Sequence, residues 1–216
     1  MVIAIDGPAG AGKSTVARAV AAELGFTYLD SGAMYRSVAL AAREAGVDAD
    51  DGAALGALAA GLAIDFDGRR VLLGGRDVSD EIRRPEVTAD ASRVSVHPAV
   101  REAMVARQRE LIAAGDYVAE GRDIGTVVSP DSPLKIFLTA SVEQRAARRH
   151  NQLISRGIPA NIDSLLADLR MRDERDQNRA VAPLRPAEDA VLLDNSGMSI
   201  DEGVEFVLEA WDKRRR

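Results

Sequence analysis

The chain has 216 residues, of which 46 % are hydrophobic, and its formal net charge is -6. This length supports one sizeable core, and the acidic balance argues against a general binder of nucleic acid or of anionic membranes, because those partners demand a spread-out basic surface. The absence of cysteine excludes disulfides and thiolate zinc sites, and two histidines leave little for a histidine-based metal site. No stretch approaches the roughly 20 apolar residues of a membrane span, so we expect a cytoplasmic protein.

Strand-like and helix-like segments alternate along the chain. Apolar runs typical of strands are found at 2–5, 27–29, 116–120, 135–139 and 190–194. The helical segments between and after them are 13–24, 34–46, 98–114, 141–156, 161–179 and 200–213. Residues 63–87 break this alternation with turn signals at Asp67-Gly68 and Gly74-Gly75, which predicts a small hairpin-bearing insertion. We therefore expect a single α/β domain with a parallel sheet and crossover helices.

The first predicted strand leads directly into a glycine-rich segment, GPAGAGKST, which precedes a predicted helix. A strand followed by G-x-x-x-x-G-K-S and a helix is the phosphate-binding loop pattern in its required context. The glycines let backbone N–H groups surround phosphate oxygens, and the helix dipole favours the same anion. The pattern predicts a binding loop for ATP or GTP made of Gly7, Pro8, Ala9, Gly10, Ala11, Gly12, Lys13, Ser14 and Thr15.

Two residues of this loop have specific expected tasks. We expect Lys13 to reach the β and γ phosphates and the hydroxyl of Ser14 to help hold Mg²⁺. No Asn-Lys-x-Asp sequence occurs in the chain, so the guanine-reading element of the common GTPases is missing. A kinase would need a second substrate site as well.

The segment LDSGAMYR, which opens the helix after the second strand, suits a second anionic ligand. Asp30 or Ser31 can cap this helix, and Arg36 lies within about two turns of its amino end, where the helix dipole attracts an anion. An ordinary helix cap with a solvated arginine is the alternative interpretation.

The segment EGRD follows the strand-like run 116–120. Open α/β sheets keep their ligand contacts at the carboxyl ends of strands, so Arg122 and Asp123 are placed for function. A salt bridge in a turn is the alternative.

Arginines gather on one side of the predicted helix 141–156. Arg145, Arg148, Arg149 and Arg156 fall at helical spacing, and no Asp or Glu stands three or four residues from any of them. Arginine presents a rigid fork that suits phosphate oxygens, so this stripe predicts a polyphosphate clamp. A solvated helix face is the alternative, because salt screens charge repulsion on an open surface.

The predicted helix 161–179 changes character along one line. That line holds, in order, Ile162, Leu165, Leu169, Arg172, Asp176 and Arg179. We expect the helix to begin on the core and to end over a polar cleft. Surface pairing of Asp168 and Asp176 with Arg172 is the alternative.

Together these segments resemble a known family, the bacterial cytidylate (CMP/dCMP) kinases, which are P-loop nucleoside monophosphate kinases. The resemblance runs over nearly the whole chain, through IDGPAGAGKST, LDSGAMYR, VSDEIRRPEV, ASRVSVHPAVREAM, EGRDIGTVV, KIFLTASVEQRAARR and RDERDQNRAVAPL. The first motif is generic, whereas the insertion together with GRD and RDxRDxNR is specific to this family. Two departures, Ser14 where GKGT is often seen and Glu120 where DGRD is common, remove no group that the reaction needs.

The resemblance implies a P-loop nucleoside monophosphate kinase fold with a central five-stranded parallel sheet flanked by helices. It implies a core of residues 1–30, 98–144 and 161–216, a monophosphate-binding lobe with the insertion at 31–97, and a short lid near 145–160. It also implies the reaction of ATP with CMP or dCMP, with Mg²⁺, to give ADP and CDP or dCDP. We expect a monomer with no nucleic-acid or membrane partner.

The resemblance also implies roles for individual residues. Ser92, Arg101 and Asp123 would read the cytosine, and Ser31, Arg36 and Arg122 would contact the acceptor nucleotide and hold its phosphate. Sugar or phosphate contacts would come from Arg172, Asp176 and Arg179, and the lid arginines would be Arg145, Arg148 and Arg149. The catalytic set would be Lys13, Arg122, Arg145 and Arg149.

Three other functions remain open. One is a nucleotide kinase of UMP or broader pyrimidine specificity. Another is a P-loop small-molecule kinase, such as one for shikimate, which would need a carboxylate to receive the hydroxyl proton and has no use for an insertion at 63–97. The third is a nucleotide-binding regulator without turnover, which would release no ADP when CMP is present.

Overall fold

A computed structural model describes residues 1–155 and 157–215. The chain divides into two compact units, one made of Met1–Leu29 with Ala114–Arg216 and the other of Asp30–Ala113. Arg156, which we predicted in the arginine stripe, and Arg216 lie outside the described residues.

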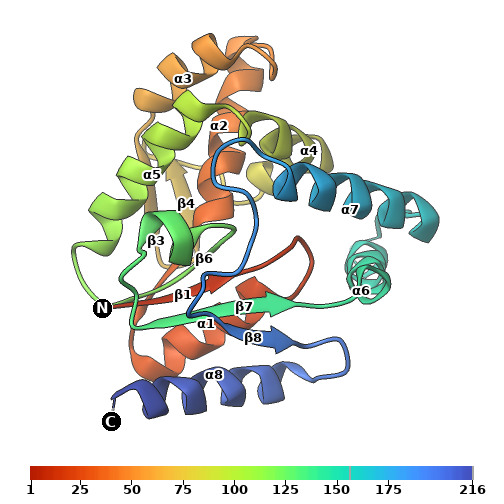
Figure 1. Cartoon of the computed structure of the whole chain (residues 1–216). Coiled ribbons are helices and arrows are strands. Elements are labelled where there is room, and N and C mark those ends of the chain that lie inside the picture. The colour runs from red at the N-terminus through yellow and green to blue at the C-terminus, as the bar shows by residue number, and fades with distance from the viewer. Residues whose placement is uncertain (156, 216) are drawn as a thin grey trace. The chain divides into compact units, whose positions relative to one another are not determined.

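The first unit contains a five-stranded parallel sheet, which confirms the predicted fold class. Its strands, in the order β2-β6-β1-β7-β8, are β2 (Thr27–Asp30), β6 (Tyr117–Gly121), β1 (Val2–Asp6), β7 (Leu134–Thr139) and β8 (Val191–Asp194) (Figure 1). The central strand β1 pairs in parallel with both β6 and β7. All five residues of β1 are buried, as expected for a parallel strand covered on both faces.

Four α-helices belong to this unit: α1 (Lys13–Leu24), α6 (Val142–Ile154), α7 (Ile162–Gln177) and α8 (Ile200–Arg215). Helices α1 and α8 lie side by side along the sheet (Figure 1). Their apolar faces close the core, where Trp211 is 1 % exposed and meets the ring of Phe26 edge-on at 5.8 Å. Among the described residues, none of the helices is both long and apolar enough to cross a membrane.

Helix α7 differs from the prediction at both ends. It ends at Gln177, so Arg179 lies beyond it, in the loop that follows. Ile162, which we expected to lie on the core, is 45 % exposed, and α7 packs against α6. The prediction that this helix begins on the core is therefore wrong.

The second unit is built around a small antiparallel sheet, which confirms the predicted hairpin-bearing insertion. This sheet has the strands β3 (Ile64–Asp67), β4 (Arg70–Leu73) and β5 (Arg76–Asp77), and a 3-10 turn over Glu81–Arg83 follows it. The helices of the unit are α2 (Ser31–Ala45), α3 (Gly52–Ala60), α4 (Pro85–Val94) and α5 (Pro98–Ile112). The unit includes α5, which we had assigned to the core, and α5 packs against α3.

The sequence analysis placed the start of α2 three residues late and did not predict α3 or α4. Helix α2 begins at Ser31 because the carboxylate of Asp30 accepts the N–H of Ala33 at 2.9 Å and caps its first turn.

Candidate active site

The loop that follows β1 has the backbone of an anion cradle. Gly7, Gly10 and Gly12 have φ angles of 148°, 75° and 100°, which favour glycine, and α1 begins directly after Gly12. A Cβ on Gly7 would lie 1.9 Å from the carbonyl oxygen of Leu138 in β7, so no larger residue fits there. The geometry supports the predicted phosphate loop at the carboxyl end of the central strand.

Lys13 is buried under this loop and donates to the carbonyl oxygen of Pro8 at 2.8 Å. The pKa of Lys13 is lowered to about 7, mainly by burial and then by the nearby cations Arg122 and Arg172, against the opposing charges of Glu120 and Asp6. Two arginines from distant segments therefore come close enough to Lys13 to disfavour its charge. Such a surplus of positive charge suits a polyphosphate ligand.

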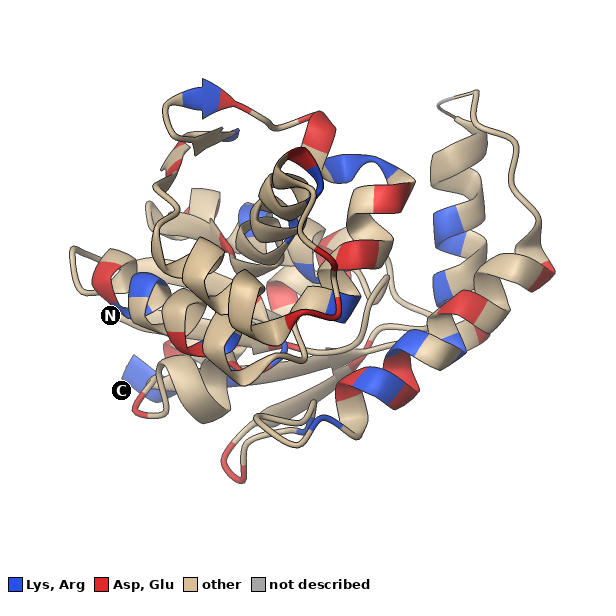
Figure 2. Cartoon of the chain, turned by 90° about the horizontal axis from the view of Figure 1, so that it is seen from above, with Lys and Arg blue, Asp and Glu red and all other residues tan. Residues whose placement is uncertain are grey.

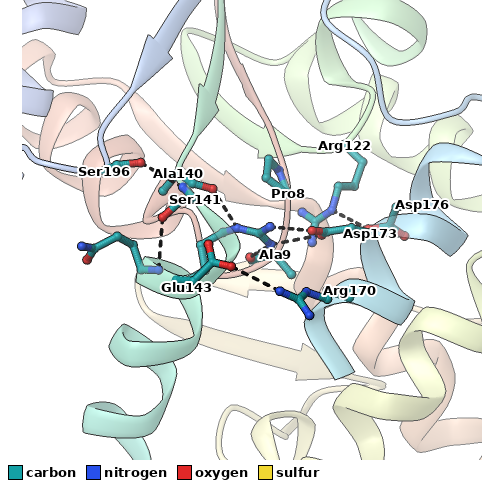
Figure 3. A network of polar contacts seen from close by, with 12 residues as sticks. Pro8, Ala9, Arg122, Ala140, Ser141, Glu143, Arg170, Asp173, Asp176 and Ser196 are labelled. Atoms are coloured by element: carbon teal, nitrogen blue, oxygen red, sulfur yellow. Dashed lines mark hydrogen bonds and ion pairs between the residues drawn. The ribbon is translucent and has the colours of Figure 1, made fainter. Parts of the chain in front are cut away.

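Arg122 and Asp176 form the centre of this cluster. Arg122 Nε donates to Asp176 Oδ2 at 2.9 Å, and Figure 3 shows the two side chains meeting from the end of β6 and from α7. Burial alone would raise the pKa of Asp176, but the charges of Arg122, Arg172 and Arg179 hold it below its usual value. Three of the predicted arginines are thus brought together around the carboxylate of Asp176, which is itself a predicted residue.

Arg179 shapes the loop after α7. Its Nη2 donates to the carbonyl oxygen of Ala182 at 2.6 Å. Ala182, with a φ of 51°, is the one non-glycine residue with a positive φ among residues 1–155 and 157–215. Strained backbone of this kind gathers at functional sites, and here it lies beside the arginine cluster.

Arg145 contacts the phosphate loop from α6. It is 4 % exposed, and its guanidinium donates to the carbonyl oxygens of Ala9 at 3.0 Å and Ala140 at 3.0 Å. The same side chain forms a two-pronged ion pair with Asp173 of α7, with distances of 3.1 and 2.5 Å. The prediction of an unpaired arginine is therefore wrong at Arg145, because its partner is 28 residues away and not on its own helix.

Arg148, the next arginine of α6, also contacts the backbone of the loop. Its Nη1 donates to the carbonyl oxygen of Ala11 at 3.2 Å and to Asn195 Oδ1 at 3.0 Å. Asn195, from the loop after β8, donates from Nδ2 to the same carbonyl oxygen at 2.9 Å. Two side chains from separate elements thus hold this carbonyl of the loop.

Arg149 and Ser14 lie at the more open side of these elements. Arg149 donates to Gln152 on its own helix at 2.8 Å, and Figure 2 shows basic residues following one another along α6. Ser14 is exposed at the start of α1. Asp123, in contrast, is 4 % exposed and stands directly before a π-helical turn, Ile124–Val128.

In the second unit, Arg36 pairs with the helix cap of α2. Arg36 Nη2 donates to Asp30 Oδ2 at 2.8 Å, and Ser31 is buried beside this pair as the first residue of the helix. Burial would raise the pKa of Asp30, but Arg36, the capped N–H of Ala33 and Arg83 hold it below its usual value. Two arginines thus surround the amino end of α2.

Ser92 and Arg101 lie inside the second unit, on α4 and α5. They are 4 % and 2 % exposed. The guanidinium of Arg101 lies over the ring of Tyr35, 5.8 Å from its centre, which keeps the charge in a fixed orientation.

A family model described as cytidylate kinase matches residues 3–213. The chain belongs to this family.

Relatives named cytidylate kinase match at high identity. The one from Burkholderia mallei is 57 % identical over 210 residues, which is 97 % of this chain and 92 % of that protein. The one from Bordetella bronchiseptica is 54 % identical, covering 97 % of this chain and 94 % of its own.

Solved structures share the fold of this cytidylate kinase family member at low identity. An uncharacterized protein from Eubacterium ventriosum aligns with a TM-score of 0.56 and 12 % identity over 98 % of both chains. A gluconokinase from Sinorhizobium meliloti aligns with a TM-score of 0.51 and 17 % identity over 98 % of this chain and 91 % of its own.

Three side chains to which we assigned no role from the sequence contribute to this kinase's candidate site. Asp173 and Asn195 hold the loop through Arg145 and Arg148, and buried Glu120 accepts a hydrogen bond from the hydroxyl of Tyr28 while its charge raises the pKa of Lys13. Asp173 could have been found as the second residue of the family motif RDxRDxNR, which begins at Arg172. Asn195 carries no local signal, because its partner in the loop is 184 residues away.

Proposed function

We propose that this chain transfers the γ-phosphoryl group of ATP to CMP or dCMP and releases ADP with CDP or dCDP. The observation that carries the proposal is the position of Lys13, buried beneath a phosphate loop with Arg122 and Arg172 near enough to lower its pKa. Membership of the cytidylate kinase family supports the choice of acceptor.

On the donor side, the proposed ligands are the backbone N–H groups of residues 7–15, with Lys13 between the β and γ phosphates. Mg²⁺ takes oxygen ligands and keeps several waters, and the exposed hydroxyl of Ser14 fits such a partial set. The bound ion would supply charge neutralisation between the β and γ phosphates.

On the acceptor side, we propose that Ser92, Arg101 and Asp123 read the cytosine. Arg36 and Arg122 would hold the acceptor phosphate, with Ser31 beside them at the start of α2. Arg172, Asp176 and Arg179 would contact the sugar or phosphates. Burial of the reading groups supports these roles, since a buried polar group left without its ligand penalises the wrong base.

Among the lid arginines, we propose different tasks. Arg145 is held by Asp173 and by two backbone carbonyls, so it positions the loop. Arg149 contacts Gln152 on its own helix, and we propose that it approaches the transferred phosphoryl group.

The mechanism follows from charge. The acceptor phosphate is already anionic at pH 7, so its attack on the γ-phosphorus needs no general base, but in-line placement and relief of repulsion between two anions. Lys13 and the arginines supply that relief. Water has to be excluded, or ATP would be hydrolysed, and we propose that the lid helices and the second unit close for this purpose.

A coupled ADP-release assay with CMP, dCMP, UMP, AMP and shikimate tests the proposal. We expect turnover with CMP and dCMP at least about tenfold above UMP in kcat/KM, because a missing hydrogen-bond partner in a built site costs that much or more. Equal turnover of UMP would favour a broader pyrimidine kinase, and turnover of shikimate would overturn the proposal. Tight CMP binding without ADP release would favour a regulator.

The variant Lys13→Ala tests the donor side. We expect kcat to fall by about 100-fold or more, because the transition-state charge loses its buried partner, while the fold is retained. The matched control is Lys213→Ala, because the side chain of Lys213 is 76 % exposed. This variant should behave as the wild type. Near-normal turnover of Lys13→Ala would refute the role of this lysine.

A further inference from the structure

Asp6 is a buried carboxylate that the mechanism above does not use. It is the last residue of β1, directly before Gly7 of the phosphate loop, and it is 5 % exposed. Its Oδ1 accepts the backbone N–H of Ile124 and its Oδ2 accepts that of Gly125, both at 2.8 Å. One side chain therefore joins the end of the central strand to the segment directly after Arg122 and Asp123.

The segment that Asp6 holds is the start of the π-helical turn Ile124–Val128. The first N–H groups of a helical turn have no partner within it and need an acceptor. Inside this turn, Val127 and Val128 donate to the carbonyl oxygen of Asp123 at 2.9 and 3.2 Å, which fixes the turn to that residue. Asp6, which is 118 residues from Ile124 in the sequence, acts as the cap of this turn. The orientation of Asp123, the residue directly before the turn, therefore depends on this carboxylate.

The charged groups around Asp6 come from three elements. Asp123 lies before the turn, Lys13 lies at the start of α1, and the stem of Lys135 in β7 passes Gly125 while its Nζ donates to Asp189 at 2.9 Å. Burial raises the pKa of Asp6 to about 6, the two backbone N–H groups oppose the rise, and the charge of Asp123 adds to it.

We propose that Asp6 is a positioning residue for cytosine recognition: its ionised carboxylate fixes the turn behind Arg122 and Asp123, and CMP recognition weakens when Asp6 takes up a proton. The inference rests on the proposed function and adds a residue and a pH dependence to it. Among the described residues, both hydrogen bonds of this carboxylate go to the turn and not to the phosphate loop. The effect is therefore expected in CMP binding and not in ATP binding.

The variant Asp6→Asn tests the geometry. Its amide oxygen can accept one N–H, but its NH2 group faces the other N–H, donor against donor. We expect KM for CMP to rise about tenfold or more at pH 7.5, with KM for ATP changed by less than about twofold. Asp131→Asn, an exposed aspartate between the same turn and β7, is the matched control and should leave both constants unchanged. An equal rise in KM for ATP, or no rise in KM for CMP, would overturn the inference.

The wild-type protein provides a second measurement that does not depend on how the variant folds. Cytidine carries no phosphate that titrates, so its inhibition constant against CMP reports recognition of the base and sugar without the phosphate. We expect this constant to weaken about tenfold from pH 7 to pH 5, as the ionised fraction of Asp6 falls, and to be flat in Asp6→Asn. A flat wild-type profile would overturn the inference even if CMP turnover is normal. A wild-type protein that does not turn over CMP would overturn the proposed function, and the inference with it.

Discussion

Asp123 and Arg101 are charged side chains that are 4 % and 2 % exposed, each inside its own unit of the chain. Burying a charge is costly unless partners satisfy it, so such residues persist where they have a task. The guanidinium of Arg101 also lies over the ring of Tyr35. Fixed, desolvated groups suit recognition of a base edge.

The variants Asp123→Asn and Arg101→Ala test this task. We expect each to raise KM for CMP by about 10- to 100-fold, because one partner of a buried charged hydrogen bond is lost, with much smaller effects on KM for ATP. Steady-state kinetics with each substrate varied in turn would measure the split. Arg84→Ala, an exposed arginine of the second unit, serves as control, and equal effects on both substrates would remove these residues from base reading.

At this scale the phosphate loop is the most predictable feature, because its pattern is local and its glycines have the φ angles that the pattern requires. Pairings between residues that are far apart in the sequence were harder to predict. The sequence shows that Arg145 is charged, but its ion pair with Asp173 depends on how α6 and α7 pack. The task of Arg145 is therefore clear only from the structure.

At the scale of elements, three segments meet at one carbonyl of the phosphate loop. Arg148 of α6 and Asn195 after β8 both donate to the oxygen of Ala11, and Arg148 also donates from Nη2 to the carbonyl oxygen of Asn195 at 2.8 Å. Helix α6 and the loop after β8 are thus both joined to the phosphate loop by hydrogen bonds. We therefore expect this arrangement to couple ATP binding to the β8–α8 connection.

We expect Asn195→Ala to raise KM for ATP by about five- to tenfold, because the carbonyl of Ala11 loses one of its two donors and the loop becomes less ordered. KM for CMP should change little. Asn195→Asp keeps an acceptor for Arg148 but places a carboxylate against the carbonyl, so it should be at least as impaired as the alanine variant. Asn151→Ala, an exposed asparagine on α6, is the control; an unchanged KM for ATP in both Asn195 variants would contradict this coupling.

The helices that the sequence did not predict have weak local signals. Helix α3 consists of alanine, leucine and glycine, and Gly56 allows close packing, since a Cβ there would lie 2.5 Å from that of Ala99 in α5. Helix α4 begins with Pro85 after the hairpin and contains poor helix formers such as Thr88. Both depend on packing within the second unit, against α5 and α2 respectively, which a single sequence does not reveal.

At the scale of the whole molecule, a net charge of -6 coexists with a local excess of positive charge around Lys13. Burial favours the uncharged forms of Asp6 and Lys13. Placing these two groups in the site therefore has a cost in folding stability. That cost depends on pH.

The pKa of Asp6 is about 6 in the folded protein and 3.8 in the unfolded chain, so the folded state binds the proton more tightly. The contribution of Asp6 to stability is therefore fully present below pH 3.8 and is lost as pH rises through about 6, by about 3 kcal/mol in total. We expect the free energy of unfolding of Asp6→Asn, relative to wild type, to rise by about 1 kcal/mol between pH 5 and pH 7.5. Urea unfolding at the two pH values measures it, and a constant difference would contradict the shifted pKa.

Trp211 is the sole tryptophan of the chain and is buried in the core of the first unit, against Phe26. In a denaturation experiment, its fluorescence emission reports the separation of α8 and α1 from the sheet. It does not report the unfolding of Asp30–Ala113. Circular dichroism at the helix band draws on both units, because each is rich in helices. A denaturation midpoint that differs between the two optical signals would reveal that the halves of this kinase melt in sequence and not as one cooperative block.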